Sequence, residues 1–256
     1  MRIVAGIPAR MGSTRFRGKP LAPLLGLTMI EHVYKRTALC SQLDEVFVAT
    51  CDQEIMDAVA AFGGKAVMTS DTHQRASDRI AEASENLDAD IVVMVQGDEP
   101  MLIPEMVDAA LEPMINDPSI LCVNLAKRID TLEEYQDRNT IKVVMDLEGN
   151  ALYYSREPVP TKQIQDFGKF PVFKQVCIIP FRREFLLEYS RLEPTPLEVA
   201  ESVDMLRILE HGMSVRLVET DVSSHAVDTE ADLKMVEGLM TGDPVLARYM
   251  SGGQAQ

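Results

Sequence analysis

Long apolar runs are missing from this sequence of 256 residues. The longest, such as Ile91–Val95, are far too short to cross a bilayer, so we expect no association with a membrane. The first residues are charged and then apolar, but basic residues follow at once and no small-residue cleavage site is present. We therefore expect a first strand there rather than a secretion signal.

Cysteine is also scarce, and its spacing argues against the familiar metal sites. The four cysteines are Cys40, Cys51, Cys122 and Cys177. They form no CxxC pair and no Cys/His ligand pattern, so we expect reduced thiols, no structural zinc and a cytoplasmic protein.

Acidic residues are absent from the first 30 positions, although the whole chain carries a formal net charge of −15. That negative charge argues against binding to nucleic acid or to an anionic membrane. The basic residues of the first 30 positions are Arg2, Arg10, Arg15, Arg17 and Lys19. A cluster of basic residues on an acidic protein indicates either a local anion-binding site or a solvated loop. The nearby glycines favour the anion-binding site.

Strand and helix patterns alternate through the first half of the chain, whose 46% hydrophobic and 25% charged residues are typical of a globular protein. Apolar strands are predicted at Ile3–Ile7, Glu45–Thr50 and Ile91–Val95, with amphipathic helices between them. One of these helices spans 52–62, and Asp52 is placed to be its N-cap. This order predicts an α/β fold with a doubly wound, mostly parallel, Rossmann-like sheet.

After about residue 120 the pattern changes to short strands followed by helices at 183–192 and 197–211, and a last helix is predicted at Glu230–Met240. We expect a single domain over residues 1–240, in which about 120–185 form an inserted β-rich lobe. Residues 241–256 are expected to be a flexible tail.

The loop after the first strand, residues 8–20, is the first candidate site. Gly12 and Gly18 let backbone N–H groups approach an anion, and the basic residues among them supply compensating charge. Five residues rather than four separate the glycines and Pro20 replaces the required Ser or Thr, so this is not a Walker A loop. It is not the dinucleotide GxGxxG motif either. The residues alone predict an exposed phosphate-binding loop.

Two aspartates are candidate metal ligands. Asp98 comes directly after the most apolar strand, where either a turn or a Mg²⁺ site would explain it, since Mg²⁺ prefers one or two carboxylates together with phosphate oxygens. Asp228 precedes the last helix, either as its N-cap or as a second metal carboxylate. The polar segment 71–79 is by default a loop and a helix cap.

Together these segments resemble the 3-deoxy-manno-octulosonate (Kdo) cytidylyltransferases, in the same order over about residues 3–240. The motifs that carry the resemblance are Pro8-Ala9-Arg10-x-Gly12-Ser13-Thr14-Arg15 with Gly18-Lys19-Pro20, Met29-Ile30-x-His32-Val33, Phe62-Gly63-Gly64, Val95–Pro100, Ala151–Arg156, Glu201-Ser202 with Leu206-Arg207, and Val227-Asp228-Thr229. The resemblance implies a nucleotidyltransferase core that transfers the cytidylyl group of CTP to a small acidic sugar.

The same resemblance assigns roles to residues. Lys19, Arg15, Asp98 and Asp228 would be catalytic, and the two aspartates would hold Mg²⁺, with Mn²⁺ as a substitute. The nucleotide would lie near Ala9, Arg10, Gly12, Ser13, Arg15, Lys19, Arg75, Ser77 and Arg79. The acceptor would lie between the core and the lobe, near Gln96, Arg156, Gln175 and Glu201. The lobe would form a homodimer.

Departures from the family pattern fall mainly on the acceptor side. Gln175 and Cys177 stand where the family usually has His and Gly, and Arg75-Ala76-Ser77 replaces Ser-Gly-Thr. Phe16-Arg17 replaces Leu-Pro in the first loop. The acceptor therefore stays open between Kdo, 8-amino-Kdo, a nonulosonic acid and a small phosphonate. A sugar-1-phosphate nucleotidyltransferase and a catalytically inactive homologue are the other interpretations.

Overall fold

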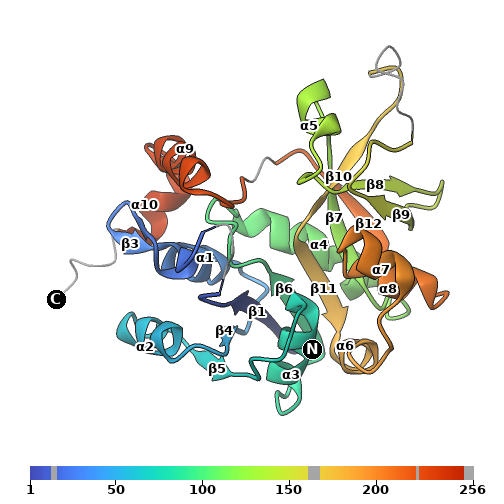
Figure 1. Ribbon diagram of the computed structural model, residues 1–256. Coiled ribbons are helices and arrows are strands. Elements are labelled where there is room, and N and C mark those ends of the chain that lie inside the picture. The colour runs from blue at the N-terminus through green and yellow to red at the C-terminus, as the bar shows by residue number, and fades with distance from the viewer. Residues whose placement is uncertain (13–15, 161–167, 223–224, 251–256) are drawn as a thin grey trace. The chain divides into compact units, whose positions relative to one another are not determined.

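The computed structural model describes residues 1–12, 16–160, 168–222 and 225–250 (Figure 1). The chain divides into two compact units, Met1–Asp108 with Ser224–Gln256, and Ala109–Ser223. The second unit extends further at both ends than the lobe expected at about 120–185. Within the described ranges, every helix is too short or too polar to traverse a bilayer.

A parallel sheet forms the centre of the first unit. Its strands lie in the order β6 (Ile91–Val95), β1 (Ile3–Ala9), β4 (Glu45–Thr50) and β5 (Ala66–Met68). All three pairings between these neighbours are parallel. Every residue of β6 is buried, as expected for a strand covered on both faces of a parallel sheet. The predicted doubly wound α/β fold is confirmed.

The helices between these strands are α1 (Met29–Thr37), α2 (Gln53–Ala61) and α3 (Ala76–Ser84). A short helix η1 (Lys19–Leu21) and the hairpin of β2 (Pro23–Leu24) and β3 (Leu27–Thr28) precede α1. In Figure 1, α1 and α3 lie on opposite sides of β1. The chain runs outward from β1 to β4 and β5 and then returns to β6 on the other side of β1. The strand order thus reverses between β1 and β6, where the loops leaving the two strands diverge and open a site.

The last two helices, α9 (Glu230–Met240) and α10 (Pro244–Met250), belong to the first unit. The expected flexible tail is therefore wrong for residues 244–250. Buried Arg36 of α1 pairs with Asp243, and its Nε donates to the Tyr249 hydroxyl at 3.1 Å. The His32 ring lies 2.7 Å from the same hydroxyl. These long-range polar contacts fix α10, and nothing in the local sequence announces them.

A mixed sheet forms the centre of the second unit, which the chain enters within α4 (Pro104–Asn116). Its strand order is β12 (Arg216–Thr220), β7 (Val123–Arg128), β10 (Phe173–Val176), β8 (Lys142–Met145) and β9 (Ala151–Ser155). Only the β12–β7 pairing is parallel. The remaining elements are α5 (Leu132–Gln136), β11 (Ile178–Arg182), α6 (Arg183–Tyr189), α7 (Pro196–Glu201) and α8 (Met205–Glu210).

The single helix predicted at 197–211 is wrong, because the chain breaks it into α7 and α8. Ser202 ends α7 in the left-handed conformation, with φ of 55° and ψ of 50°. A non-glycine residue rarely adopts that conformation, so the helical pattern of the sequence did not reveal the break. The break leaves Glu201 at the C-terminal end of α7.

Candidate active site

Two hydrogen bonds at the backbone of Met11 hold the loop after β1. The Met11 N–H donates to the Asp52 carboxylate at 2.8 Å, and the Gly18 N–H donates to the Met11 carbonyl at 3.2 Å. Gly18 has a φ of 73°, which favours glycine. Asp52 does precede α2, but its side chain makes no capping hydrogen bond. Asp52 is thus the N-cap residue of α2, as predicted, but its carboxylate anchors the first loop instead of capping the helix.

Lys19 connects three segments that lie far apart in the sequence. Its Nζ donates to Asp98 Oδ2 at 2.8 Å and to the Val227 carbonyl at 2.7 Å, and lies 3.5 Å from Asp228 Oδ1. The side chain is only 13% exposed, so the expectation of an exposed loop is wrong at this position. One ammonium thus brings together the two aspartates that the sequence suggested as metal ligands.

Backbone packing places both aspartates. A Cβ added at Gly97 would lie 2.6 Å from the Pro8 carbonyl oxygen, so only glycine lets the ends of β1 and β6 approach this closely. The Asp98 carbonyl then accepts the Val227 N–H at 2.9 Å, which ties down the segment before α9. The N-cap of α9 is Thr229, in a capping box with Asp232. The interpretation of Asp228 as that cap is wrong, and its carboxylate faces Lys19.

A pocket of about 300 Å³ opens here, entirely within the first unit. Four basic side chains and two carboxylates line it, although the chain as a whole is strongly acidic. Such a balance suits a polyanion bound together with a metal ion. Its lining residues are Pro8, Ala9, Arg10, Lys19, Pro20, His73, Gln74, Arg75, Ala76, Arg79, Gln96, Gly97, Asp98 and Asp228.

Not every predicted nucleotide residue lines this pocket. Ser77 is fully buried in the first turn of α3, and Gly12 is exposed. Neither is among the lining residues. Ser13 and Arg15 lie outside the described residues.

The segment before α3 contains polar contacts that the sequence did not predict. Buried Arg79 donates to Thr69 Oγ1 at 2.6 Å, and His73 of the pocket pairs with Glu82. Burial alone would raise the pKa of Glu82, but the Ser70 N–H, His73 and Arg79 together lower it. Glu82 is therefore an ionised acceptor that holds this loop. A His nine residues before a Glu follows no helical spacing, so only the fold could reveal the pair.

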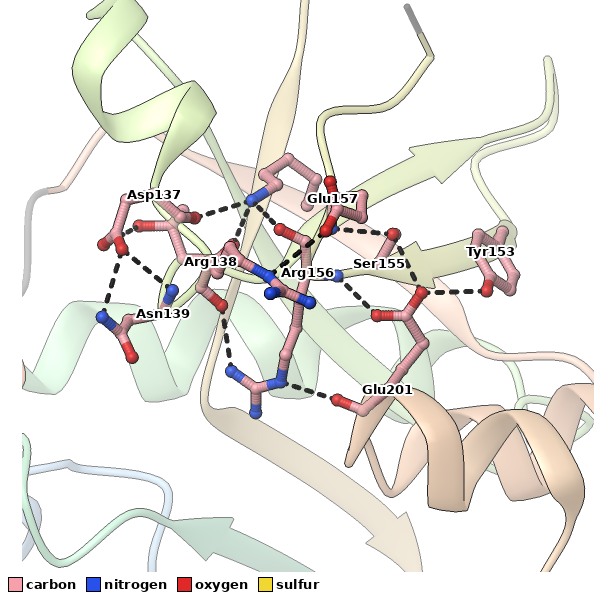
Figure 2. A network of polar contacts seen from close by, with 10 residues as sticks. Asp137, Arg138, Asn139, Tyr153, Ser155, Arg156, Glu157 and Glu201 are labelled. Atoms are coloured by element: carbon pink, nitrogen blue, oxygen red, sulfur yellow. Dashed lines mark hydrogen bonds and ion pairs between the residues drawn. The ribbon is translucent and has the colours of Figure 1, made fainter. Parts of the chain in front are cut away.

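Of the predicted acceptor residues, three lie in the second unit, namely Arg156, Gln175 and Glu201. The fourth, Gln96, lines the pocket of the first unit. Figure 2 shows Arg156 and Glu201 bonded to each other. The Glu201 carboxylate accepts from Tyr153 Oη at 3.1 Å, from Ser155 Oγ at 3.0 Å and from the Arg156 N–H at 2.8 Å. Burial opposes ionisation, but these donors outweigh it and lower the pKa of Glu201. Gln175 has another partner, donating to Asn124 Oδ1 at 2.8 Å.

The described part of the chain holds no group of three or more His, Cys, Asp or Glu side chains arranged to bind a metal. The Asp98–Asp228 pair nevertheless fits a Mg²⁺ ion, which commonly takes only one or two protein carboxylates and completes its shell with water and phosphate oxygens. The pair carries two negative charges against the single charge of Lys19. The donor set therefore suits a divalent cation that arrives with a phosphorylated ligand.

In open α/β sheets, ligands bind where the strand order reverses, and this pocket lies at the carboxyl ends of β1 and β6. The first unit is therefore a Rossmann-like nucleotidyltransferase core. The chain belongs to the cytidylyltransferase family, which matches residues 4–216.

Several known proteins are similar to this chain over nearly its full length. The 3-deoxy-manno-octulosonate cytidylyltransferase of Geobacter metallireducens is 47% identical over 93% of this chain and 98% of its own. The 3-deoxy-manno-octulosonate cytidylyltransferase of Geotalea uraniireducens is 46% identical over 92% of this chain and 98% of its own. The solved structure of CMP:2-keto-3-deoxy-manno-octonic acid synthetase complexed with CTP matches with a TM-score of 0.88 at 39% identity, covering 95% of this chain and all of that one.

A more distant structure shares the fold alone. The 4-diphosphocytidyl-2C-methyl-D-erythritol synthase of Anaerococcus prevotii has a TM-score of 0.63 at 14% identity, and covers 94% of this chain and 98% of that one. The resemblance seen in the motifs and the family match thus agree, and the family is confirmed.

Proposed function

We propose that this chain couples CTP to Kdo, giving CMP-Kdo and pyrophosphate. The observation that carries the proposal is the convergence of Lys19, Asp98 and Asp228 in a cationic pocket at the end of the first strand. Relatives that cover almost the whole chain bear the name of this activity, which supports the choice of CTP and Kdo.

The reaction is an in-line displacement. The anomeric hydroxyl oxygen of the acid forms a bond to the α-phosphorus of CTP, the bond from that phosphorus to the β-phosphate oxygen breaks, and pyrophosphate leaves with the bonding electrons. The hydroxyl proton passes to solvent. Because both substrates are anions, the main task of the protein is to neutralise charge and to hold the groups in line.

The pocket residues supply that neutralisation. Arg10, Lys19 and Arg75 would contact the phosphates. Asp98 and Asp228 would hold Mg²⁺. When bound, this ion would neutralise phosphate charge and orient the triphosphate.

Steady-state measurements of pyrophosphate release test the proposal. CTP is expected to be strongly preferred over UTP, ATP and GTP, and chelation of Mg²⁺ should abolish activity. Kdo should be compared with 8-amino-Kdo, a nonulosonic acid, a small phosphonate and a sugar 1-phosphate. Turnover with the phosphonate but with no ulosonic acid would refute Kdo as the acceptor and leave cytidylyl transfer standing. Equal use of UTP would refute cytidylyl specificity, and no release with any pair would indicate an inactive homologue.

We further propose that the enzyme is a homodimer assembled through its second unit, and that it acts in the cytoplasm. Apolar side chains exposed on that unit support the dimer, among them Leu152 at 61% and Val199 at 64%. Four free thiols are typical of a reducing compartment. Light scattering coupled to gel filtration measures the mass in solution, and a monomer at micromolar concentration would contradict the dimer.

A further inference from the structure

Lys142 is a charged residue in the interior of the second unit, at the first position of β8. Its side chain is 0% exposed. Its Nζ donates to the carbonyl oxygens of Asp137 at 2.7 Å, Thr140 at 2.7 Å and Arg156 at 2.6 Å. Burial is the main cause that lowers the pKa of Lys142. An ammonium has three N–H donors for these three carbonyls, whereas a neutral amine would leave one of them without a donor, so the site is built for the charged form.

The three carbonyls join two separate pieces of chain. Asp137 and Thr140 delimit a turn between α5 and β8, and Arg156 follows the end of β9. The Asp137 carboxylate closes the same turn by accepting from the Asn139 N–H at 2.9 Å and from Thr140 Oγ1 at 3.3 Å. Lys142 therefore fixes the backbone of Arg156 against a turn that is itself internally bonded.

That turn also holds the side chain of Arg156. Its Nη1 donates to the Arg138 carbonyl at 3.1 Å, while its Nε donates to the Glu201 carbonyl at 2.6 Å (Figure 2). The planar guanidinium is thus held between the turn and the end of α7. Its position depends on the backbone of Arg156 and on the turn, and Lys142 bonds directly to both.

We infer that Lys142 is a positioning residue for the acid acceptor, acting through Arg156. This inference rests on the proposed function, and on the role near the acceptor that the family resemblance implies for Arg156. Lys142 does not touch the substrate. Its ammonium sets where the guanidinium lies, and the fixed guanidinium recognises the acid.

Steady-state kinetics of Lys142→Met, varying CTP and Kdo separately, test this role. The KM for Kdo is expected to rise at least about tenfold, since a displacement of about 1 Å at a positioning group can cost up to 100-fold. The KM for CTP should stay within about twofold, because the nucleotide pocket lies in the other unit. The core variant Leu186→Ala is the matched control, since it destabilises the same unit away from this network and should leave the KM for Kdo unchanged.

A double-mutant cycle with Arg156→Ala separates positioning from general stability. If Lys142 acts through Arg156, then Lys142→Met should add little to the KM for Kdo in the Arg156→Ala background. Lys142→Gln, which keeps two N–H donors, replaces Lys142→Met if that variant does not fold, and the same changes are expected of it. An unchanged KM for Kdo, or fully additive effects, would overturn the inference alone. No CMP-Kdo from the wild-type enzyme would overturn the proposed function, and the inference with it.

Discussion

Substituting Lys19 by alanine should weaken the fold of the first unit as well as its activity. The change removes an ammonium that donates to Asp98 at 2.8 Å and to the Val227 carbonyl at 2.7 Å. Hydrogen bonds to charged groups contribute about 1.5–3 kcal/mol each. Because the two carboxylates are 29% and 30% exposed, water replaces part of this interaction, and we expect a loss of about 2 kcal/mol in the free energy of unfolding. For a protein of this size that corresponds to a fall of roughly 4–8 °C in Tm.

Mg²⁺ should restore much of this stability. With Lys19 gone, the carboxylates of Asp98 and Asp228 face each other without that ammonium, so a divalent cation should bind the Lys19→Ala protein more readily than the wild type. A ligand present at 100 times its Kd stabilises by about 2.7 kcal/mol. Thermal melts in EDTA and at rising MgCl₂ concentration measure both effects, and turnover should remain very low throughout because the triphosphate lacks its lysine.

The matched control is Lys35→Ala, which removes the i,i+4 pair of Lys35 with Glu31 on α1 at 2.8 Å. Helical pairs at this spacing contribute about 0.3–0.5 kcal/mol, so this variant should melt close to the wild type and respond to Mg²⁺ as the wild type does. The assignment of Lys19 as the cation that balances the two aspartates would be refuted by two results together. These are a Tm of Lys19→Ala in EDTA equal to that of the wild type, and a rise in Tm with Mg²⁺ no larger than that of the wild type.

Three further variants probe other parts of the structure. Asp52→Asn replaces the charged acceptor of the Met11 N–H by a neutral one, and should raise the KM for CTP about fivefold in steady-state assays; no change would show that the loop does not need this anchor. Glu198→Ala removes the partner of buried Arg207 and should cost about 3–5 kcal/mol in urea unfolding, while a loss below about 1 kcal/mol would contradict the importance of the pair. The pKa of Glu201 is lowered in the fold, so its ionised carboxylate should make the wild type more stable than Glu201→Gln. This difference in unfolding free energy should be complete above pH 4.5 and decline as the pH falls further. A difference independent of pH would contradict the ionised carboxylate.

Elements with a strong local pattern were predicted well from the sequence. The strands Glu45–Thr50 and Ile91–Val95 and the helix Glu230–Met240 have the predicted bounds. An apolar run between turn residues is enough to predict a strand, and an amphipathic stretch after a capping residue is enough to predict a helix. Lys19 and Asp98 come after predicted strands, which indicated the carboxyl edge of a parallel sheet. The metal role of Asp228 was implied only by the family resemblance.

Side-chain partners were harder to predict, because they depend on residues distant in the sequence. Asp52 follows a strand and precedes a helix, so capping was the local choice, yet its carboxylate bonds to Met11, 41 residues away. Lys19 was expected on an exposed loop, yet its ammonium bonds to the Val227 carbonyl, 208 residues further on. For Lys142, the residues of β8 gave no sign that the ammonium would bind three carbonyls.

The discontinuity of the first unit matters during translation. The ribosome makes Lys19 and Asp98 early, then the whole second unit, and only afterwards Asp228. A nascent chain that has emerged through residue 222 contains the strands β6, β1, β4 and β5 but lacks one of the two carboxylates and the Val227 carbonyl that hold the lysine. Prematurely terminated chains should therefore be inactive rather than partly active, and an unfinished enzyme would not consume CTP while still on the ribosome.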